Sequence, residues 1–473
     1  MSEVNHQEHV GELKRGLQNR HIQLIALGGA VGTGLFLGAG GAIFAAGPAV
    51  LLGYGVAGAL AFLIIRQLGD MVAEEPVAGS FSFFAYKYWG DFPGFLSGWN
   101  YWILYVLVGI SELTAAAAYM QYWWPDVPTW LTAAVFFVMI NAINMATVKA
   151  YGEMEFWFAI IKVATICLMI VVGLYILLFN TGLVEGATFK NLWQGPTVGA
   201  HVGDASVAGF MPNGLGGLLV ALPIIMFAFG GLELVGITAA EANDPQRVIP
   251  KACNQVIWRI LIFYIGVMAV LLSLYHWSNL SRDQSPFVMV FDKIGFKAAA
   301  GFINFVVLTA ALSVYNSCVY SNSRMLYALA LQGNAPKIFE KTDKRGVPMM
   351  AMTVAGILTF LVVPLNYFVP VVHEAFGKAM SVVVAALVIN WGMISLSHLY
   401  FAKQKRAENH KTVFPSPLFP ISNYLCIAWV GFVLWAMYSK LGMHAAVIAV
   451  PIWVAIVFAG YKLLKPHPVK AGQ

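Results

Sequence analysis

Charge is scarce in this sequence. Only 11% of the 473 residues are Asp, Glu, Lys or Arg, against roughly 25% in soluble domains. Hydrophobic residues make up 59% of the chain. This composition excludes a soluble globular protein and indicates an integral membrane protein that lies in a lipid bilayer. Since the net charge of +6 must be interpreted by location in such a chain, it does not indicate a nucleic-acid partner.

Several motifs of enzymes and ATP-driven pumps are also missing. The four cysteines have no paired-Cys or Cys/His spacing, so we expect neither disulfides nor a metal site. The chain has no Gly-x-x-x-x-Gly-Lys-Ser/Thr phosphate-binding loop, which argues against a protein driven by ATP. Most of the ten histidines lie near segment ends, where they form no cluster with a nucleophile or an acid. We therefore expect no enzyme activity and no cofactor, and a membrane receptor remains an alternative from another class.

Long apolar runs are abundant and predict an all-α membrane protein with twelve spans. The spans are expected at 22–46, 49–73, 96–123, 129–148, 154–180, 213–240, 254–277, 298–331, 348–369, 376–401, 419–440 and 444–464. The polar first 19 residues contain no cleavable signal peptide. Lys and Arg concentrate in the connections on the side of the N-terminus, which predicts that both termini are cytoplasmic.

Glycine interrupts the first span where a helix should be strongest. Leu27–Gly41 reads LGGAVGTGLFLGAGG and contains seven glycines, each of which costs a helix interior about 1 kcal/mol relative to alanine. The sixth span carries FAFGGLE at Phe227–Glu233. Paired interruptions in corresponding segments of two halves are typical of a transporter binding site, although two helix interfaces packed through glycine are an alternative.

Spans one to five and six to ten each open with such an interrupted helix. Because five is odd, the second set enters the membrane from the opposite side, which predicts a 5+5 inverted repeat. The expected divisions are a cytoplasmic segment (1–20), the first repeat (21–180), an external loop (181–212), the second repeat (213–401), two peripheral helices (402–464) and a tail (465–473).

An amino acid has two constant charges, and both interrupted helices offer groups that match them. N–H groups exposed at Thr33 and Gly34 would bind the carboxylate. Carbonyl groups near Ala30, Phe227 and Gly230 would accept hydrogen bonds from the α-ammonium group. The Phe227 ring is expected to cover the substrate, although a packed core aromatic is the alternative.

Several long segments carry a family resemblance. LKRGLQNRHIQLIALGGAVGTGLFLG, RQLGDMVAEEPVAGSFSFFAYKYWG, YGEMEFWFAIIK, FAFGGLELVGITAAEANDP and SVYNSCVYSNSRMLYALALQGNAPK resemble the bacterial amino-acid permeases of the amino acid–polyamine–organocation superfamily. The resemblance covers nearly the whole chain, and overall similarity favours the aromatic amino-acid branch. It implies the LeuT-like fold, the cytoplasmic (inner) membrane, and the same roles for Gly32–Gly34 and Phe227.

Lys162 lies well inside the fifth span, where a lysine is costly and normally functional. Sodium-coupled relatives of this architecture hold a sodium ion between helices one, five and eight. The resemblance implies that Lys162 replaces this ion and couples transport to protons. Ser313 and Ser317, one turn apart on the eighth span, are expected to hydrogen-bond it. A lysine that snorkels from a shorter span is the alternative.

Four glutamates and two tyrosines complete the set of candidate residues. Glu233 follows the second interruption and is expected in gating or the proton path. Glu112, inside the third span, has coupling and structural roles as equal alternatives. Glu153 and Glu155 are expected to be a solvated cap of span five. Tyr101 and Tyr105, one turn apart, are expected to line the pocket.

These features together predict a secondary transporter that imports aromatic L-amino acids (Phe, Tyr, Trp) by proton symport. The two interrupted helices are expected to give alternating access to the site. A transporter of the same fold for another neutral or a cationic amino acid is the alternative within this class, since Glu112 would suit a cationic substrate.

Overall fold

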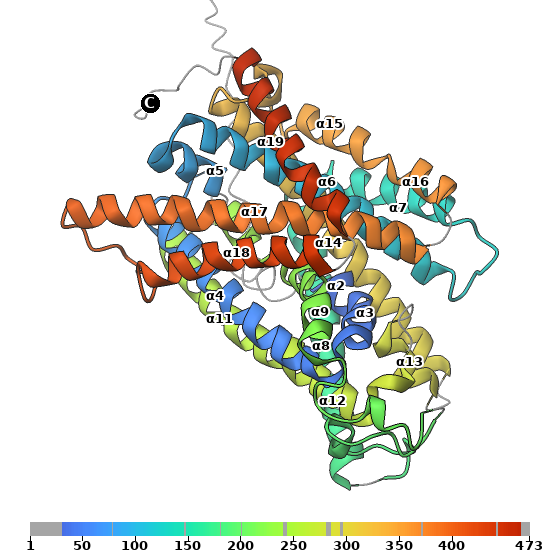
Figure 1. The fold of residues 1–473 in the computed structure, drawn as a ribbon. Helices are drawn as coiled ribbons and strands as arrows, with labels where there is room; N and C mark the ends of the chain where they lie inside the picture. The colour runs from blue at the N-terminus through green and yellow to red at the C-terminus, as the bar shows by residue number, and fades with distance from the viewer. Residues whose placement is uncertain are drawn as a thin grey trace, which may run out of the picture.

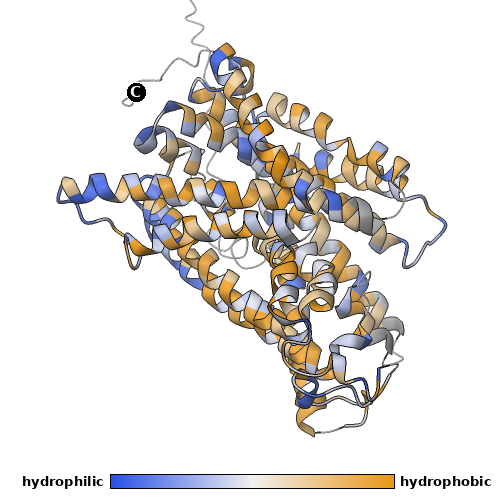
Figure 2. Cartoon of the chain, in the orientation of Figure 1, coloured by the Kyte–Doolittle hydropathy of each residue, from blue (hydrophilic) through white to orange (hydrophobic). Residues whose placement is uncertain are grey.

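The computed structural model describes residues 31–464, except 78, 146–147, 180, 200, 240–243, 281–284, 294–296, 370–371 and 441–442. Helices dominate these residues, and no strand occurs among them (Figure 1). Ten of the helical segments described are long and apolar enough to cross a membrane. Figure 2 shows hydrophobic residues along most helices, with hydrophilic residues gathered at helix ends and connections.

The helices follow one another along the whole described chain. They are α2 (Thr33–Phe36), α3 (Gly38–Ala46), α4 (Val50–Glu74), α5 (Phe81–Phe84), α6 (Asp91–Met120), α7 (Thr129–Asn144), α8 (Val148–Phe179), α9 (Gly214–Phe229), α10 (Leu234–Thr238), α11 (Pro245–Arg259), α12 (Val267–Leu274), α13 (Pro286–Lys293), α14 (Lys297–Leu331), α15 (Met349–Thr359), α16 (Val362–Phe368), α17 (Val372–Ala407), α18 (Ile421–Lys440) and α19 (His444–Leu464). Two π-helical segments, η3 (Ala85–Trp89) and η7 (Ile260–Gly266), and short 3-10 turns connect them.

The first apolar run becomes helical at Thr33. Gly32 has extended backbone, and the N–H groups of Leu35 and Phe36 bond its carbonyl. The helix then passes almost directly from α2 into α3 and turns at Gly47, whose φ of 61° suits glycine. The residues before Val31 lie outside the described part of the chain.

The second interruption separates α9 from α10. Gly230 leaves the helical conformation with ψ 143°, and Gly231 has φ 93°, a left-handed value that glycine adopts without strain. Helical structure resumes at Leu234. The FAFGGLE segment therefore contains four non-helical residues inside a run of apolar sequence.

The helices differ strongly in how much of their apolar surface the bundle covers. The apolar window of α14 is 83% buried, and those of α6 and α17 are each 72% buried. The window of α19 is only 6% buried, and this helix runs along the outside of the bundle in Figure 1. Because exposed apolar helices need lipid or a partner, α6, α14 and α17 form the inner scaffold and α19 lies at its periphery.

Candidate functional site

A small internal cavity lies where the start of α2 and the break between α9 and α10 meet α6, α14 and α17. Its volume is about 30 Å³, room for about a water molecule. It is lined by Gly32, Gly34, Leu104, Tyr105, Val108, Glu112, Phe227, Ala228, Gly230, Gly231, Glu233, Leu234, Val314, Ser317, Val383 and Leu387. Eight of the residues singled out from the sequence are among them: Gly32, Gly34, Tyr105, Glu112, Phe227, Gly230, Glu233 and Ser317.

A carboxylate from α6 holds the start of α2. The Thr33 hydroxyl donates a 2.9 Å hydrogen bond to Oε1 of Glu112. A Cβ atom added to Gly32 would lie 3.1 Å from the same oxygen and 2.6 Å from Cγ2 of Val314. Among the described residues Oε2 of Glu112 has no hydrogen-bond partner. The cavity wall therefore contains an acidic group directly beside the first interruption.

Gly34 brings α2 and α9 into backbone contact. A Cβ atom at this position would lie 2.6 Å from Cα of Ala228 and 2.9 Å from Cδ1 of Phe227. Real Cβ atoms essentially never approach that closely. The alternative of close helix packing thus describes Gly34 correctly, and this packing also forms one wall of the cavity.

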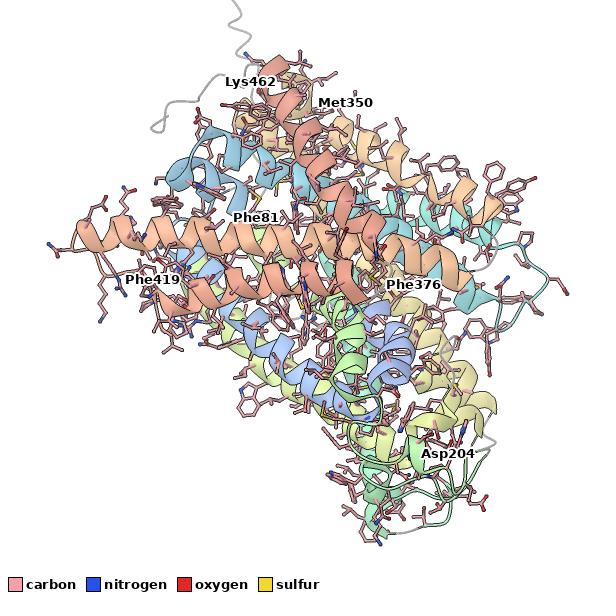
Figure 3. All side chains as sticks on the ribbon, viewed as in Figure 1. Phe81, Asp204, Met350, Phe376, Phe419 and Lys462 are labelled. Atoms are coloured by element: carbon pink, nitrogen blue, oxygen red, sulfur yellow. The ribbon has the colours of Figure 1, made fainter. Side chains whose placement is uncertain are left out.

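Tyr105, Phe227 and Glu233 form another part of the cavity wall. The Tyr105 hydroxyl donates to Oε1 of Glu233 at 3.3 Å, and Nε1 of Trp391 donates to Oε2 at 3.5 Å. The Phe227 ring meets Phe376 of α17 edge to face, at 5.7 Å between ring centroids; Figure 3 labels Phe376. Each carboxylate oxygen of Glu233 therefore has a donor in a region without exposed surface.

Tyr101 lies behind Tyr105 rather than on the cavity wall. Its ring packs 4.4 Å from Tyr105 and 4.6 Å from Phe81, centroid to centroid. It is completely buried and does not line the cavity. The structure therefore places Tyr105 on the cavity wall and Tyr101 against Phe81 of α5, and a role of Tyr101 in substrate binding stays a prediction.

A charged cluster lies between α8 and α14. Nζ of Lys162 donates to Oγ of Ser313 at 2.9 Å and lies 3.9 Å from Oε1 of Glu155. Ser313 donates to Glu155 at 2.5 Å, and Asn316 donates to its other oxygen at 3.3 Å. Lys162 and Glu155 are both fully buried. Buried charges are stable only with such partners, so these residues form one connected unit.

Ser317 joins this cluster to the cavity. It lies one turn after Ser313 on α14, and its hydroxyl is 3.4 Å from that of Tyr151. Ser317 itself lines the cavity, whereas Ser313, Lys162 and Thr33 do not. The cluster therefore lies one helix turn away from the cavity wall. No group of three His, Cys, Asp or Glu residues suited to a metal occurs in the described part of the chain.

Comparisons with known proteins identify the family of this chain. A family model described as amino acid permease matches residues 21–469. The chain is 56% identical to "Aromatic amino acid transport protein AroP" of Escherichia coli K12, over 98% of both chains. It is likewise 56% identical to the AroP protein of Salmonella typhimurium SL1344, over 97% of both, and 43% identical to "Uncharacterized amino acid permease YtnA" of Bacillus subtilis, over 95% of both.

The chain belongs to the amino acid permease family. The family resemblance expected from the sequence is confirmed. The permease is a multi-pass membrane transporter and not an enzyme. The finer assignments, such as twelve spans, the inverted repeat and the roles of individual residues, remain predictions.

The permease has two functional candidates that sequence reasoning missed. Glu155 is buried against Lys162, so its assignment as a solvated cap is wrong. The helix α8 begins at Val148, earlier than expected, which places Glu155 inside the bundle. Its spacing of seven residues from Lys162, two helical turns on one face, could have revealed the pair. Trp391 lies 158 residues from Glu233 in sequence, and no local pattern indicates that contact. Ala30 lies outside the described residues.

Proposed function

We propose that this permease imports aromatic L-amino acids together with protons. The observation that carries the proposal is the buried Lys162–Glu155 pair, which lies one turn of α14 away from a cavity between two interrupted helices. The aromatic substrate class is supported by the printed name of the AroP relatives, which match 98% of the chain at 56% identity. Phe, Tyr and Trp are the expected substrates.

The substrate would bind across the two interruptions. Its carboxylate would meet the backbone at Gly32–Gly34, and its ammonium group would meet carbonyls of Ala30, Phe227 and Gly230. The volume of this cavity is far smaller than the roughly 300–1,000 Å³ of pockets that enclose a small ligand. Binding of an aromatic side chain would therefore require Phe227 and its neighbours to move, which agrees with a lid role for Phe227.

The charge of Glu112 determines which substrate charge this arrangement would favour. A carboxylate that keeps its charge beside Thr33 would repel the carboxylate of a neutral amino acid in a region of low dielectric. A cationic amino acid would instead gain from it. This contact favours the second candidate function, transport of a cationic amino acid, and makes protonation of Glu112 a requirement of the first.

Proton coupling would use the Lys162 cluster. Lys162 and Glu155 are both fully buried. Loss or gain of one proton by either residue would therefore change the charge of a cluster that has no contact with solvent at the protein surface. Such a change must be matched by a rearrangement of partners. Protonated Lys162 would hold span one to α14 in the outward-open state, and loss of its proton would release span one. Glu233 and its donors Tyr105 and Trp391 would act as a gate.

Alternating access would follow from an inverted pair of five-helix repeats, residues 21–180 and 213–401, with both termini in the cytoplasm. Uptake by proteoliposomes without sodium tests the proposal. An inward proton gradient should drive accumulation of labelled Phe, and excess Tyr or Trp should compete, whereas Lys and Pro should not. Accumulation that requires sodium would contradict proton coupling, and preferential competition by Lys would establish the cationic alternative.

A further inference from the structure

A second, larger cavity lies at one end of the bundle, away from the proposed transport site. It has a volume of about 310 Å³ and lies between the end of α4, the last turns of α17 and the connection before α18. It is lined by Asp70, His398, Ala402, Lys405, Arg406, Asn409, His410, Lys411, Thr412, Pro415, Ser416 and Phe419. Three Lys or Arg residues and one carboxylate contribute to this wall, so its charge is positive.

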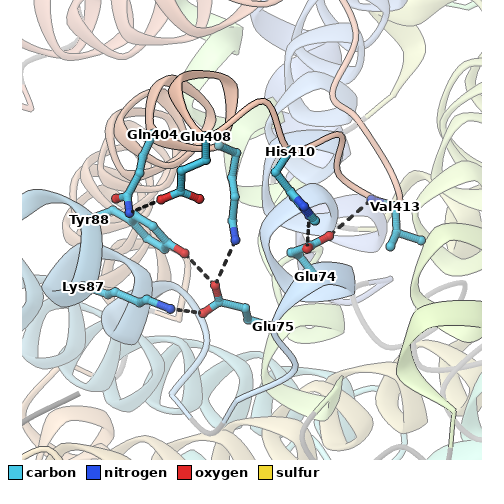
Figure 4. Close-up of polar contacts among 9 residues, drawn as sticks. Glu74, Glu75, Lys87, Tyr88, Gln404, Glu408, His410 and Val413 are labelled. Atoms are coloured by element: carbon cyan, nitrogen blue, oxygen red, sulfur yellow. Dashed lines mark hydrogen bonds and ion pairs between the residues drawn. The ribbon is translucent and has the colours of Figure 1, made fainter. Parts of the chain in front are cut away.

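Most charges around this cavity have partners within the protein. His410 contacts Glu74 at 2.5 Å, and Glu75 lies 3.7 Å from Lys405 (Figure 4). One oxygen of Asp70 contacts Nε2 of His398 and accepts from the Ser416 N–H, each at 3.0 Å. These contacts fasten the 408–416 segment to the end of α4, so the cavity has a defined wall.

Two cations on the wall have no acidic partner in the part of the chain that the structure describes. Among the described residues no carboxylate lies within ion-pair distance of Arg406 or Lys411. The Arg406 guanidinium instead lies over the Phe419 ring, 4.2 Å from its centroid; Figure 3 labels Phe419 beside the end of α17. A guanidinium that contacts a ring in this way can still offer N–H groups to an anion, and phosphate is an anion that matches its fork of donors.

Apolar side chains next to the cavity place it at the membrane boundary. The side chains of Val413, Leu418 and Ile421 are 56%, 69% and 69% exposed. Ile421 begins α18, whose 20 residues span about 30 Å, the thickness of the hydrocarbon core. An α18 that crosses this core would place the cavity at its boundary, level with the phosphate groups of the lipid, and would place Ile421 at the edge of the acyl region.

We infer that this cavity binds the phosphate group of an anionic phospholipid. Arg406 and Lys411 bind the phosphate, Thr412 and Asn409 offer further hydrogen bonds, and the acyl chains lie along Leu418, Ile421 and the exposed face of α18. Basic pockets between membrane helices bind anionic head groups by the same attraction. This inference concerns a site separate from the transport pathway and does not rest on the proposed function.

Thermal unfolding of the full-length protein in detergent tests the inference. Short-chain phosphatidylglycerol, phosphatidylcholine with the same acyl chains, and inorganic phosphate are titrated separately while the melting temperature is recorded. Phosphatidylglycerol should raise the melting temperature of the wild type, and the other two should have little effect. Arg406→Gln and Lys411→Gln should each raise the half-saturating lipid concentration about fivefold, the effect of roughly 1 kcal/mol per cation near an anionic surface.

Lys403→Gln is the matched control. Lys403 lies on the same helix and is exposed, yet it does not line the cavity. It should keep the wild-type response although it loses the same charge. An equal loss of response in Lys403→Gln, or an unchanged response in both cavity variants, would overturn the inference. An equal shift with phosphatidylcholine would overturn the preference for anionic lipid, and an equal shift with inorganic phosphate would overturn the lipid assignment.

Discussion

The hydroxyl of Thr33 and the carboxylate of Glu112 are joined by a 2.9 Å hydrogen bond across α2 and α6. An acidic side chain of the third predicted span thus lies where the substrate carboxylate is proposed to bind. The second oxygen of Glu112 has no partner in the described part of the protein. A protonated Glu112 would suit a neutral substrate, and a charged Glu112 would suit a cationic one.

Replacing Glu112 with Gln separates these two possibilities. The amide can still accept the Thr33 hydrogen bond but carries no charge, so binding of labelled Phe should stay within about threefold of wild type or become tighter. If the natural substrate is cationic, binding of Lys should instead fall more than about tenfold, as expected for a lost buried charge contact. Equilibrium binding in detergent measures both, with Glu340→Gln, far from the cavity, as a control. Loss of Phe binding in Glu112→Gln would contradict the proposed orientation of the substrate.

Gly34 should not accept even one additional carbon atom. The Cβ of Gly34→Ala would lie 2.6 Å from the Ala228 backbone, so we expect a destabilisation of about 1–3 kcal/mol together with reduced Phe binding. Gly34→Leu should insert into the membrane but fail to bind. Gly216→Ala on α9, where a Cβ meets nothing within 4 Å, is the control. Wild-type melting temperature and binding in Gly34→Leu would show that this contact is dispensable.

Variants of the Lys162–Glu155 pair should show whether the pair stabilises the fold, couples transport to protons, or does both. Lys162→Ala leaves Glu155 buried without its ammonium partner, a loss of about 3–5 kcal/mol, and it should abolish gradient-driven uptake. Adding Glu155→Gln should restore part of the melting temperature and none of the accumulation. Lys162→Arg should also fail to accumulate substrate, because arginine does not release its proton.

The exposed Lys190→Ala variant controls for the loss of a lysine in this experiment. Substrate accumulation by Lys162→Ala would show that the lysine is structural. The coupling group would then be sought at Glu233 or Glu112.

Glu75 should make the stability of the permease depend on acidic pH. Burial opposes the effect, but hydrogen bonds from Lys87 and Tyr88 and the charges of Lys87 and Lys405 lower the pKa of Glu75 below its usual value. A lowered pKa in the folded state stabilises above the pKa of the unfolded state, and this stabilisation is lost as pH falls through the folded value. The melting temperature of wild type should therefore fall more steeply than that of Glu75→Gln below about pH 4.5. Parallel curves for the two proteins would contradict this role.

Local sequence patterns predicted the residues at the helix interruptions but not the contacts between distant helices. Glycine and apolar runs indicated the interruption at Gly230 and the helical start near Thr33, because backbone preference is a local property. The seven-residue spacing of Glu155 and Lys162 was also local, yet the expected start of span five misplaced Glu155 relative to the membrane. The Thr33–Glu112 and Glu233–Trp391 contacts join residues 79 and 158 positions apart. Their pairing depends on how whole helices pack, which no single segment encodes.

The contact of Gly34 with Ala228 joins two helices without interlocking side chains. Where ridges of large side chains fit into grooves, one helix can slide along another only by leaving those grooves. At Gly34 no side chain of α2 fills such a groove, so a shift of α2 along α9 would cross fewer barriers there than at a contact between large side chains. We therefore expect α2 to move relative to α9 by shear along this contact and not by separation from it.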